Sequence, residues 1–360
     1  MANPVENLQR TAAEYRQKDA KDKKRYWIDL ILNNALYILM VIFVIYTAIK
    51  KPNFLTLGSF ANLITQVAAY LPMALGIAGC IVLTGTDLSA GRISGLTAAI
   101  SGVLLQKTDF VNKMFANLPE VNGWWIAVTL LAAIAVGALI GLVNGFFVAK
   151  FSLHPFIVTL STQLITYGII LWFFTLNGNN SQPISGLSDE YKNFVSGEMF
   201  RLGNVAVPRY VAYAIALAAL MWFIWNKTAF GKNMFAVGSN AEAAKVSGVN
   251  VFLTTMLVHT LAGAMYGYSG FIEGARSSSI AIGTGLNAEC DAIAACVIGG
   301  VSFVGGTGKI SGIILGVVVL RLIFVALTML GVGSSSLYII KGAIILCACA
   351  LDMRKYLVKK

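Results

Sequence analysis

The chain has 360 residues, of which 57% are hydrophobic and 12% charged, and its mean hydropathy is +0.75. An average soluble domain carries roughly 25% charged residues, so this chain has too few polar groups to cover a water-soluble globule. The composition therefore excludes a soluble enzyme, a nucleic-acid-binding protein and a single-anchor protein, although the formal net charge is +11. The apolar runs are continuous, unlike the alternating pattern of a membrane β-barrel. The sequence predicts an all-α, polytopic membrane protein.

The apolar runs predict about ten transmembrane helices, since one crossing needs about 20 mostly apolar residues. The predicted spans are 27–49, a second that starts near 54–61 and ends near 84, 91–106, 124–149, 156–174, 210–226, 251–272, 288–304, 309–330 and 336–352. Spans 91–106 and 288–304 are short. Either could re-enter the membrane instead of crossing it, which leaves eight or nine crossings as alternatives.

Basic residues give the expected orientation, because Lys and Arg are retained on the cytoplasmic side. With both termini cytoplasmic, most of the 27 Lys and Arg residues fall inside. We therefore expect cytoplasmic tails at 1–26 and 353–360 around a transmembrane domain at 27–352. The polar segment 175–209 then lies outside, and the polar segment 227–250 lies inside.

Glycines recur every fourth residue in several predicted spans. The longest of these ladders are Gly137–Gly141–Gly145 and Gly308–Gly312–Gly316, and Gly91–Gly95 and Gly263–Gly267 are shorter. Small residues at this spacing let helix backbones approach closely inside a membrane. The ladders therefore predict tight helix packing.

The inner segment 227–250 carries a helix-start signal. Ser239 can cap a helix whose third position is Glu242, as in a capping box, and alanines between and after them favour helix. Gly248 is a natural stop. The sequence predicts a helix of about two turns, which is either an ordinary connector or a docking element for a cytoplasmic partner. Its candidate residues are Ser239, Asn240, Ala241, Glu242, Ala243, Ala244, Lys245 and Gly248.

Taken together, several segments resemble the permeases of bacterial ATP-binding cassette (ABC) importers for monosaccharides of the ribose/galactose type. These segments are 84–92, 154–160, 230–251, 291–303 and 338–345. The resemblance covers about residues 30–355 and is closest to the galactose/methyl galactoside branch. The long charged N-terminal tail departs from the family pattern.

The resemblance implies an importer-type ABC permease in the bacterial inner membrane that works as a homodimer. It implies two further partners, a cytoplasmic ABC ATPase subunit and a periplasmic sugar-binding protein. The expected substrate is galactose or methyl galactoside, with ribose, xylose or another monosaccharide left open. The helix at 239–248 would couple this subunit to the ATPase.

The outer segment 175–209 is long for a simple connection. It is either a solvated loop or the dock for the sugar-binding protein. Arg201, Arg209 and Arg276 are the candidate docking residues, because the arginine fork matches carboxylates of a partner.

Polar and aromatic residues in two spans are the candidates for the translocation path, with helix packing as the alternative. They are Asn144, Thr162, Gln163, Tyr167 and Trp172. Charged residues in or at the edges of spans are expected to pair inside the protein. They are Asp87, Arg92, Glu273, Glu289, Asp291, Arg321 and Lys341.

The one Gly-rich candidate for a phosphate loop, 305–310, lacks the first glycine at the required spacing and has Ile310 where Ser or Thr must bind magnesium. We therefore expect a transport subunit that is not itself an enzyme and binds no cofactor, with ATP and Mg on the partner ATPase. The rival hypotheses are an ion-coupled secondary transporter and a membrane scaffold.

Overall fold

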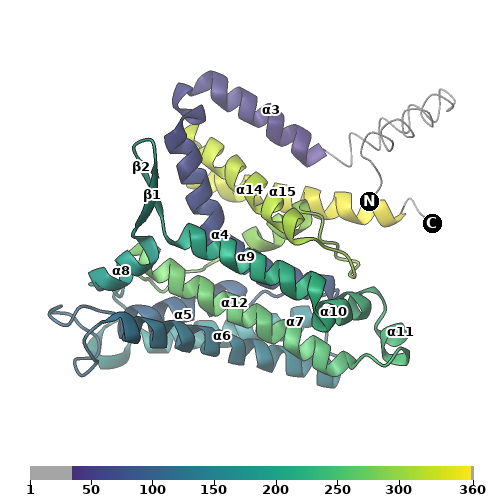
Figure 1. Ribbon diagram of the computed structural model, residues 1–360, viewed down its shortest axis with the longest axis horizontal. Helices are drawn as coiled ribbons and strands as arrows, with labels where there is room; N and C mark the ends of the chain where they lie inside the picture. The colour runs from purple at the N-terminus through teal and green to yellow at the C-terminus, as the bar shows by residue number, and fades with distance from the viewer. Residues whose placement is uncertain (1–34, 358–360) are drawn as a thin grey trace.

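The computed structural model describes residues 35–357 (Figure 1), so the predicted tail 1–26, the start of the first predicted span and residues 358–360 lie outside the described part. Within it, a helix corresponds to each of the ten predicted spans, which confirms the all-α, polytopic class. These helices are α3 (Ala35–Lys50), α4 (Leu57–Val82), α5 (Ala90–Leu104), α6 (Gly123–Phe151), α7 (Pro155–Phe173), α9 (Tyr210–Lys227), α12 (Val251–Ser277), α13 (Ala288–Ile298), α14 (Ile310–Met329) and α15 (Ser334–Leu357). Five of them, α4, α6, α7, α9 and α14, are long and apolar enough to cross a membrane.

Smaller elements mark the two ends of the helical bundle (Figure 1). At one end lie α8 (Asp189–Ser196) and an antiparallel hairpin of β1 (Glu198–Leu202) and β2 (Val205–Pro208). Two short 3-10 helices, η1 (Pro52–Leu55) and η2 (Leu176–Gly178), occur elsewhere in the chain. At the other end lie α10 (Ala229–Ser239) and α11 (Ala241–Val246). We refer to these as the hairpin end and the α11 end. In Figure 1, α3 begins and α15 ends on the same side as α11.

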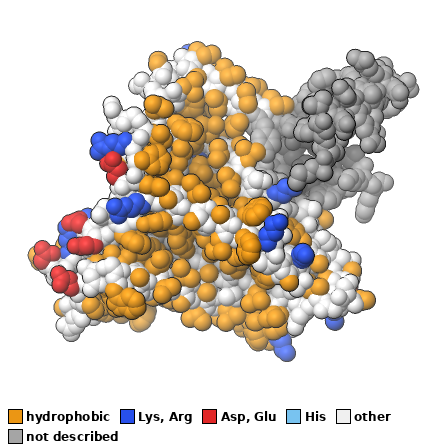
Figure 2. Space-filling model, viewed as in Figure 1, with side chains coloured by type: hydrophobic (Ala, Val, Ile, Leu, Met, Phe, Trp, Pro, Cys, Tyr) orange, Lys and Arg blue, Asp and Glu red, His pale blue; other side chains and the backbone are white. Residues whose placement is uncertain are grey.

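On the face seen in Figure 2, hydrophobic side chains cover the middle of the bundle, while charged side chains lie towards its two ends. Large apolar side chains such as Leu131, Leu164, Ile165 and Ile215 are exposed on α6, α7 and α9. An exposed apolar belt of this kind fits contact with lipid, in which only helices and closed barrels satisfy their backbone groups.

The glycine ladders bring α6 and α12 into close contact, as the sequence predicts. A Cβ at Gly137 or Gly141 would overlap the backbone of Gly263 or His259, and one at Gly267 would overlap the carbonyl oxygen of Ala133. The second ladder packs α14 on α13, because a Cβ at Gly316 would overlap the carbonyl oxygen of Ala295 on α13. Only glycine lets these backbones approach so closely.

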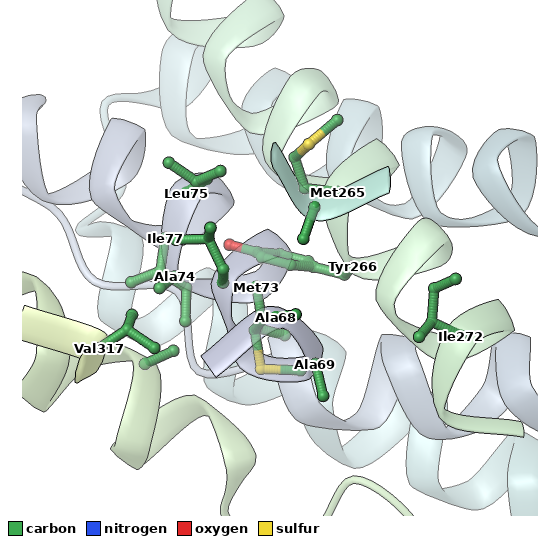
Figure 3. Packing of buried hydrophobic residues seen from close by; sticks show 14 of the residues in the cluster. Ala68, Ala69, Met73, Ala74, Leu75, Ile77, Met265, Tyr266, Ile272 and Val317 are labelled. Carbon is green, nitrogen blue, oxygen red and sulfur yellow. The ribbon is translucent and has the colours of Figure 1, made fainter. Parts of the chain in front are cut away.

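Helix α4 forms the centre of the core between α12 and α14 (Figure 3). Its residues from Leu71 to Val82 are all buried. The ring of Tyr266 on α12 crosses over Gly76, where a Cβ would lie 2.8 Å from the ring. This packing fixes α12 against α4, and therefore fixes what α12 presents to the interior.

The predicted crossing 288–304 takes a different form. Its helix, α13, ends at Ile298, and 11 residues span only about 16 Å of the roughly 30 Å hydrocarbon core. The irregular segment 278–287 supplies the rest of the path. Ile280 packs over Gly102 of α5, and a Cβ at Gly95 or Gly91 would overlap Thr284 or Gly285. The chain therefore passes from the hairpin end to the α11 end as an irregular segment followed by a short helix.

Candidate functional site

The cap of α11 differs from the predicted one by one residue. Ser239 is the last residue of α10, and its hydroxyl donates to the carbonyl oxygen of Phe235 at 2.8 Å. Asn240 is extended (φ −164°, ψ 105°), and its Oδ1 accepts from the backbone N–H of Ala243 at 2.9 Å. The predicted capping box from Ser239 to Glu242 is therefore wrong, because Ser239 belongs to a preceding helix that the sequence analysis did not foresee.

Most of α11 projects from the bundle. Ala244 is buried, while Ala241, Glu242, Ala243 and Lys245 are exposed, as is Gly248 (φ +85°), which follows the helix. Val246 is 89% exposed. A small helix with an exposed aliphatic side chain at its tip is suited to insertion into a groove of another protein. Val246 was missed in the sequence, where it follows the alanine run and carries no motif of its own.

Helix α10 connects α11 to the core. A Cβ at Gly238 would overlap the carbonyl oxygen of Val82 at the end of α4, and one at Gly306 would overlap Ser239. The N–H of Gly306 also donates to the Val82 carbonyl oxygen at 2.9 Å. Gly306 belongs to the loop between α13 and α14. A displacement of α11 would therefore be transmitted to α4 and to the loop that follows α13.

At the hairpin end, the three candidate docking arginines each have a partner within the chain. Arg201 forms a two-fold contact with Glu198 (2.7 and 2.9 Å), and Arg276 forms one with Glu273 (2.8 and 2.9 Å). Arg209 donates to the backbone carbonyl oxygen of Asn193 at 3.2 Å. Arg209 is therefore the one of these three arginines whose partner is a neutral group. Arg201 is held by a carboxylate, and its hydrogen bonds to Glu198 raise the pKa of Arg201.

The outer segment is structured rather than a plain loop, since α8 is anchored by ion pairs. Asp189 contacts the ammonium groups of Lys107 (2.6 Å) and Lys192 (2.7 Å). These contacts, that of Lys107 first, lower the pKa of Asp189 to about 2. The Lys107 pair ties α8 to the chain that follows α5, while the Lys192 pair lies within α8. They also leave the charges at this end largely balanced.

The candidate path residues of α6 and α7 are partly engaged with each other. Asn144 is fully buried, donates to the Ser89 hydroxyl at 3.0 Å and accepts from Thr162 at 2.6 Å. The guanidinium of Arg92 lies 4.3 Å from the centre of the Tyr167 ring. These contacts fasten the start of α5 to α6 and α7. Gln163 is half-buried and Trp172 is 62% exposed.

A group of buried charges lies deeper in the bundle. Asp291 of α13 pairs with Arg321 of α14 at 2.6 Å and with Lys341 of α15 at 2.7 Å. The Arg321 guanidinium also lies 3.4 Å from the centre of the Tyr70 ring of α4. Tyr70 and Arg321 both lie near the middle of their helices. The expected pairing of charges at membrane depth, including Glu273 with Arg276, is confirmed for these groups.

A polar cavity of about 220 Å³ adjoins these charges. It lies among α4, α5, α12, α13, α15 and the end of the irregular segment, and its wall includes Asp291 and Lys341. The five candidate path residues are absent from its lining. One indirect signal of this cavity was present in the sequence, namely the weak apolar run at 288–304.

A bundle of apolar helices with an exposed helix at one end and a polar cavity at mid-height is compatible with a membrane permease. Comparison with known proteins agrees. Residues 59–349 match the family described as branched-chain amino acid transport system / permease component. The chain belongs to this family.

Its relatives include sugar permeases. The chain is 43% identical over 338 residues to the galactose/methyl galactoside import permease protein MglC of Haemophilus influenzae, covering 94% of this chain and 99% of the relative. It is 42% identical to the MglC protein of Escherichia coli (94% and 98%) and 32% identical to the ribose import permease protein RbsC of the same species (91% and 95%). No solved structure shows a significant match.

Proposed function

We propose that this chain is the membrane-spanning permease subunit of an ATP-driven ABC importer for galactose or methyl galactoside in the bacterial inner membrane. The observation that carries the proposal is 43% identity over 94% of the chain to an import permease for these sugars. Identity to the ribose permease is 32%. Ribose and xylose permeases are therefore more distant relatives, and these sugars are the alternatives to be tested.

Charge distribution supports a cytoplasmic α11 end and a periplasmic hairpin end. Lysines dominate the exposed charges at the α11 end, namely Lys150, Lys227, Lys232, Lys245 and Lys309. At the hairpin end, cations alternate with the carboxylates Asp109, Glu120, Asp189, Glu190 and Glu198. Cytoplasmic ends of membrane proteins carry the excess of Lys and Arg. Both chain termini would then be cytoplasmic.

In this arrangement, α11 docks into the partner ATPase, which holds ATP and Mg, and this chain binds no cofactor itself. The exposed Val246 and Ala243 provide the contact, and α10 passes the movement on to α4 and α13. The sugar-binding protein docks at the hairpin end, where Arg209 is available to a partner carboxylate without first leaving an internal one.

The exposed part of the irregular segment supports a homodimer. In the single chain Leu286 is 50% exposed and Gly283 is also exposed. Irregular backbone at membrane depth is tolerated only where it is covered by protein or lines an aqueous cavity. This face therefore belongs against a second copy or along the shared translocation path rather than in lipid.

Substrate competition tests the sugar assignment. The permease, its cognate ATPase and its cognate binding protein are reconstituted in proteoliposomes, and uptake of labelled galactose is measured. We expect an excess of unlabelled galactose or methyl galactoside to abolish uptake of the label. The same excess of ribose or xylose should leave uptake within twofold of its value without competitor. Stronger competition by ribose or xylose would assign the chain to another sugar.

A further inference from the structure

The cavity beside Asp291 lies at mid-height in the bundle. Tyr70 stands near the middle of α4, and Arg321, which contacts both Tyr70 and Asp291, near the middle of α14. The adjoining helix α13 starts there, after the irregular segment. In many secondary transporters, solute sites lie near the bilayer midplane where helices are interrupted, and the same need for polar groups at this depth applies to any membrane path. The position of the cavity is thus that of a solute site.

Its wall carries hydrogen-bonding groups that the protein does not use. The side chains of Ser94, Ser269 and Asn287 line the cavity and make no hydrogen bond to any residue between 35 and 357. Ser94 is 2% exposed and Ser269 is 5% exposed. Neither hydroxyl is among the fully enclosed side-chain atoms that lack a partner in the described residues, so both open onto the cavity and are available to a polar occupant. Donors and acceptors on three different elements suit a solute with several hydroxyls.

The charged side chains that line the cavity, Glu273, Asp291 and Lys341, are each in an ion pair within the chain. Asp291 has one oxygen on Arg321 and the other on Lys341, and Glu273 holds Arg276. A neutral solute can occupy the cavity without breaking any of these pairs. The rings of Tyr70 and Tyr338 complete the wall with flat apolar surface. Apolar faces combined with hydrogen-bonding groups are complementary to a sugar ring.

We propose that this cavity binds a single neutral monosaccharide during its passage through the permease, with Ser94, Ser269 and Asn287 bonding its hydroxyls. The proposal rests on the function proposed above and locates its substrate. About 220 Å³ has room for roughly seven water molecules at about 30 Å³ each, which is the scale of one small polar solute. The far end of α13 leads to the loop that contacts α10, so movement at α11 would reshape this site.

Two substitutions of Ser269 separate the hydroxyl from the shape of its side chain. Ser269→Val and Ser269→Thr both enlarge the side chain. Valine and threonine have nearly the same shape, but only threonine keeps the hydroxyl. In proteoliposomes containing the ATPase and the binding protein, two quantities are measured: ATP hydrolysis stimulated by the galactose-loaded binding protein, and galactose imported per ATP hydrolysed. We expect Ser269→Val to lower the import ratio by about three- to tenfold, the effect of losing one hydrogen bond. Ser269→Thr should stay within twofold, with stimulated hydrolysis near normal in both.

Equal import ratios for the valine and threonine variants and the unaltered permease would overturn the proposal and leave the cavity with water only. If both Ser269 variants lose stimulated hydrolysis, the added methyl group is not tolerated there, and the same pair at Ser94 on the neighbouring helix α5 decides in the same way. Failure of the unaltered permease to import any sugar with ATP would instead contradict the proposed function. The two failures are therefore distinguishable.

Discussion

At the scale of single residues, the start of α11 shows what the sequence alone cannot decide, namely which of two adjacent residues caps a helix. Ser239 and Asn240 are both strong helix caps, and the choice between them depends on what precedes them. Ser239 is used inside α10, where its hydroxyl bonds Phe235. The segment 229–239 contains two glycines and no clear helical pattern. Packing of Gly238 against Val82 therefore stabilises α10, a helix that the sequence pattern did not predict.

Asn240→Ala should loosen α11 selectively. Loss of a side-chain cap costs about 1 kcal/mol, so local opening of the helix should become roughly fivefold more frequent. Hydrogen–deuterium exchange of the amides of Ala244 to Val246 measures this opening. Ser239→Ala is the control and should leave α11 unchanged, because its hydroxyl serves α10. The opposite pattern would restore the predicted capping box.

At the scale of elements, apolar runs predicted every long helix, since a membrane imposes a minimum apolar length. The hairpin was missed although a signal was present. Gly203 and Asn204 separate two short strands, and a two-residue turn with Gly at its first position is typical of a hairpin. The irregular segment 278–287 had no such signal. Its path is fixed by contacts with glycines of α5, which are far away in the sequence.

Contact between α6 and α12 should depend on single glycines. In Gly141→Ala the new methyl group would overlap the carbonyl oxygen of His259 and force two backbones apart. We expect the permease to lose about 1–3 kcal/mol of stability, seen as a lower midpoint of thermal unfolding in detergent.

Gly168→Ala is the matched control for that substitution, because nothing lies within 4 Å of the new Cβ on α7. Its midpoint should be unchanged or slightly higher, since alanine favours helix over glycine. Indistinguishable midpoints for the Gly141 and Gly168 variants would mean that α6 and α12 do not pack as described.

At the scale of the whole molecule, the residues suited to partners lie at opposite ends of an apolar bundle, and the polar cavity lies between them. The sequence indicated the polar segments at both ends, because their signals are local: an alanine-rich run that ends at Gly248 and a long polar stretch at 175–209. It could not predict the cavity, whose wall combines residues as distant as Tyr70 and Lys341. From α11 through α10 and the loop after α13, a continuous set of contacts joins one end to the cavity.

The most direct test of the account is whether transport requires ATP and both partners. Galactose uptake is measured in proteoliposomes with the complete set of components, with the ATPase or the binding protein left out, and with a proton or sodium gradient replacing ATP. The account predicts uptake only when the permease, the ATPase, the loaded binding protein and ATP are all present. Uptake by the permease alone, driven by an ion gradient, would contradict it and identify a secondary transporter.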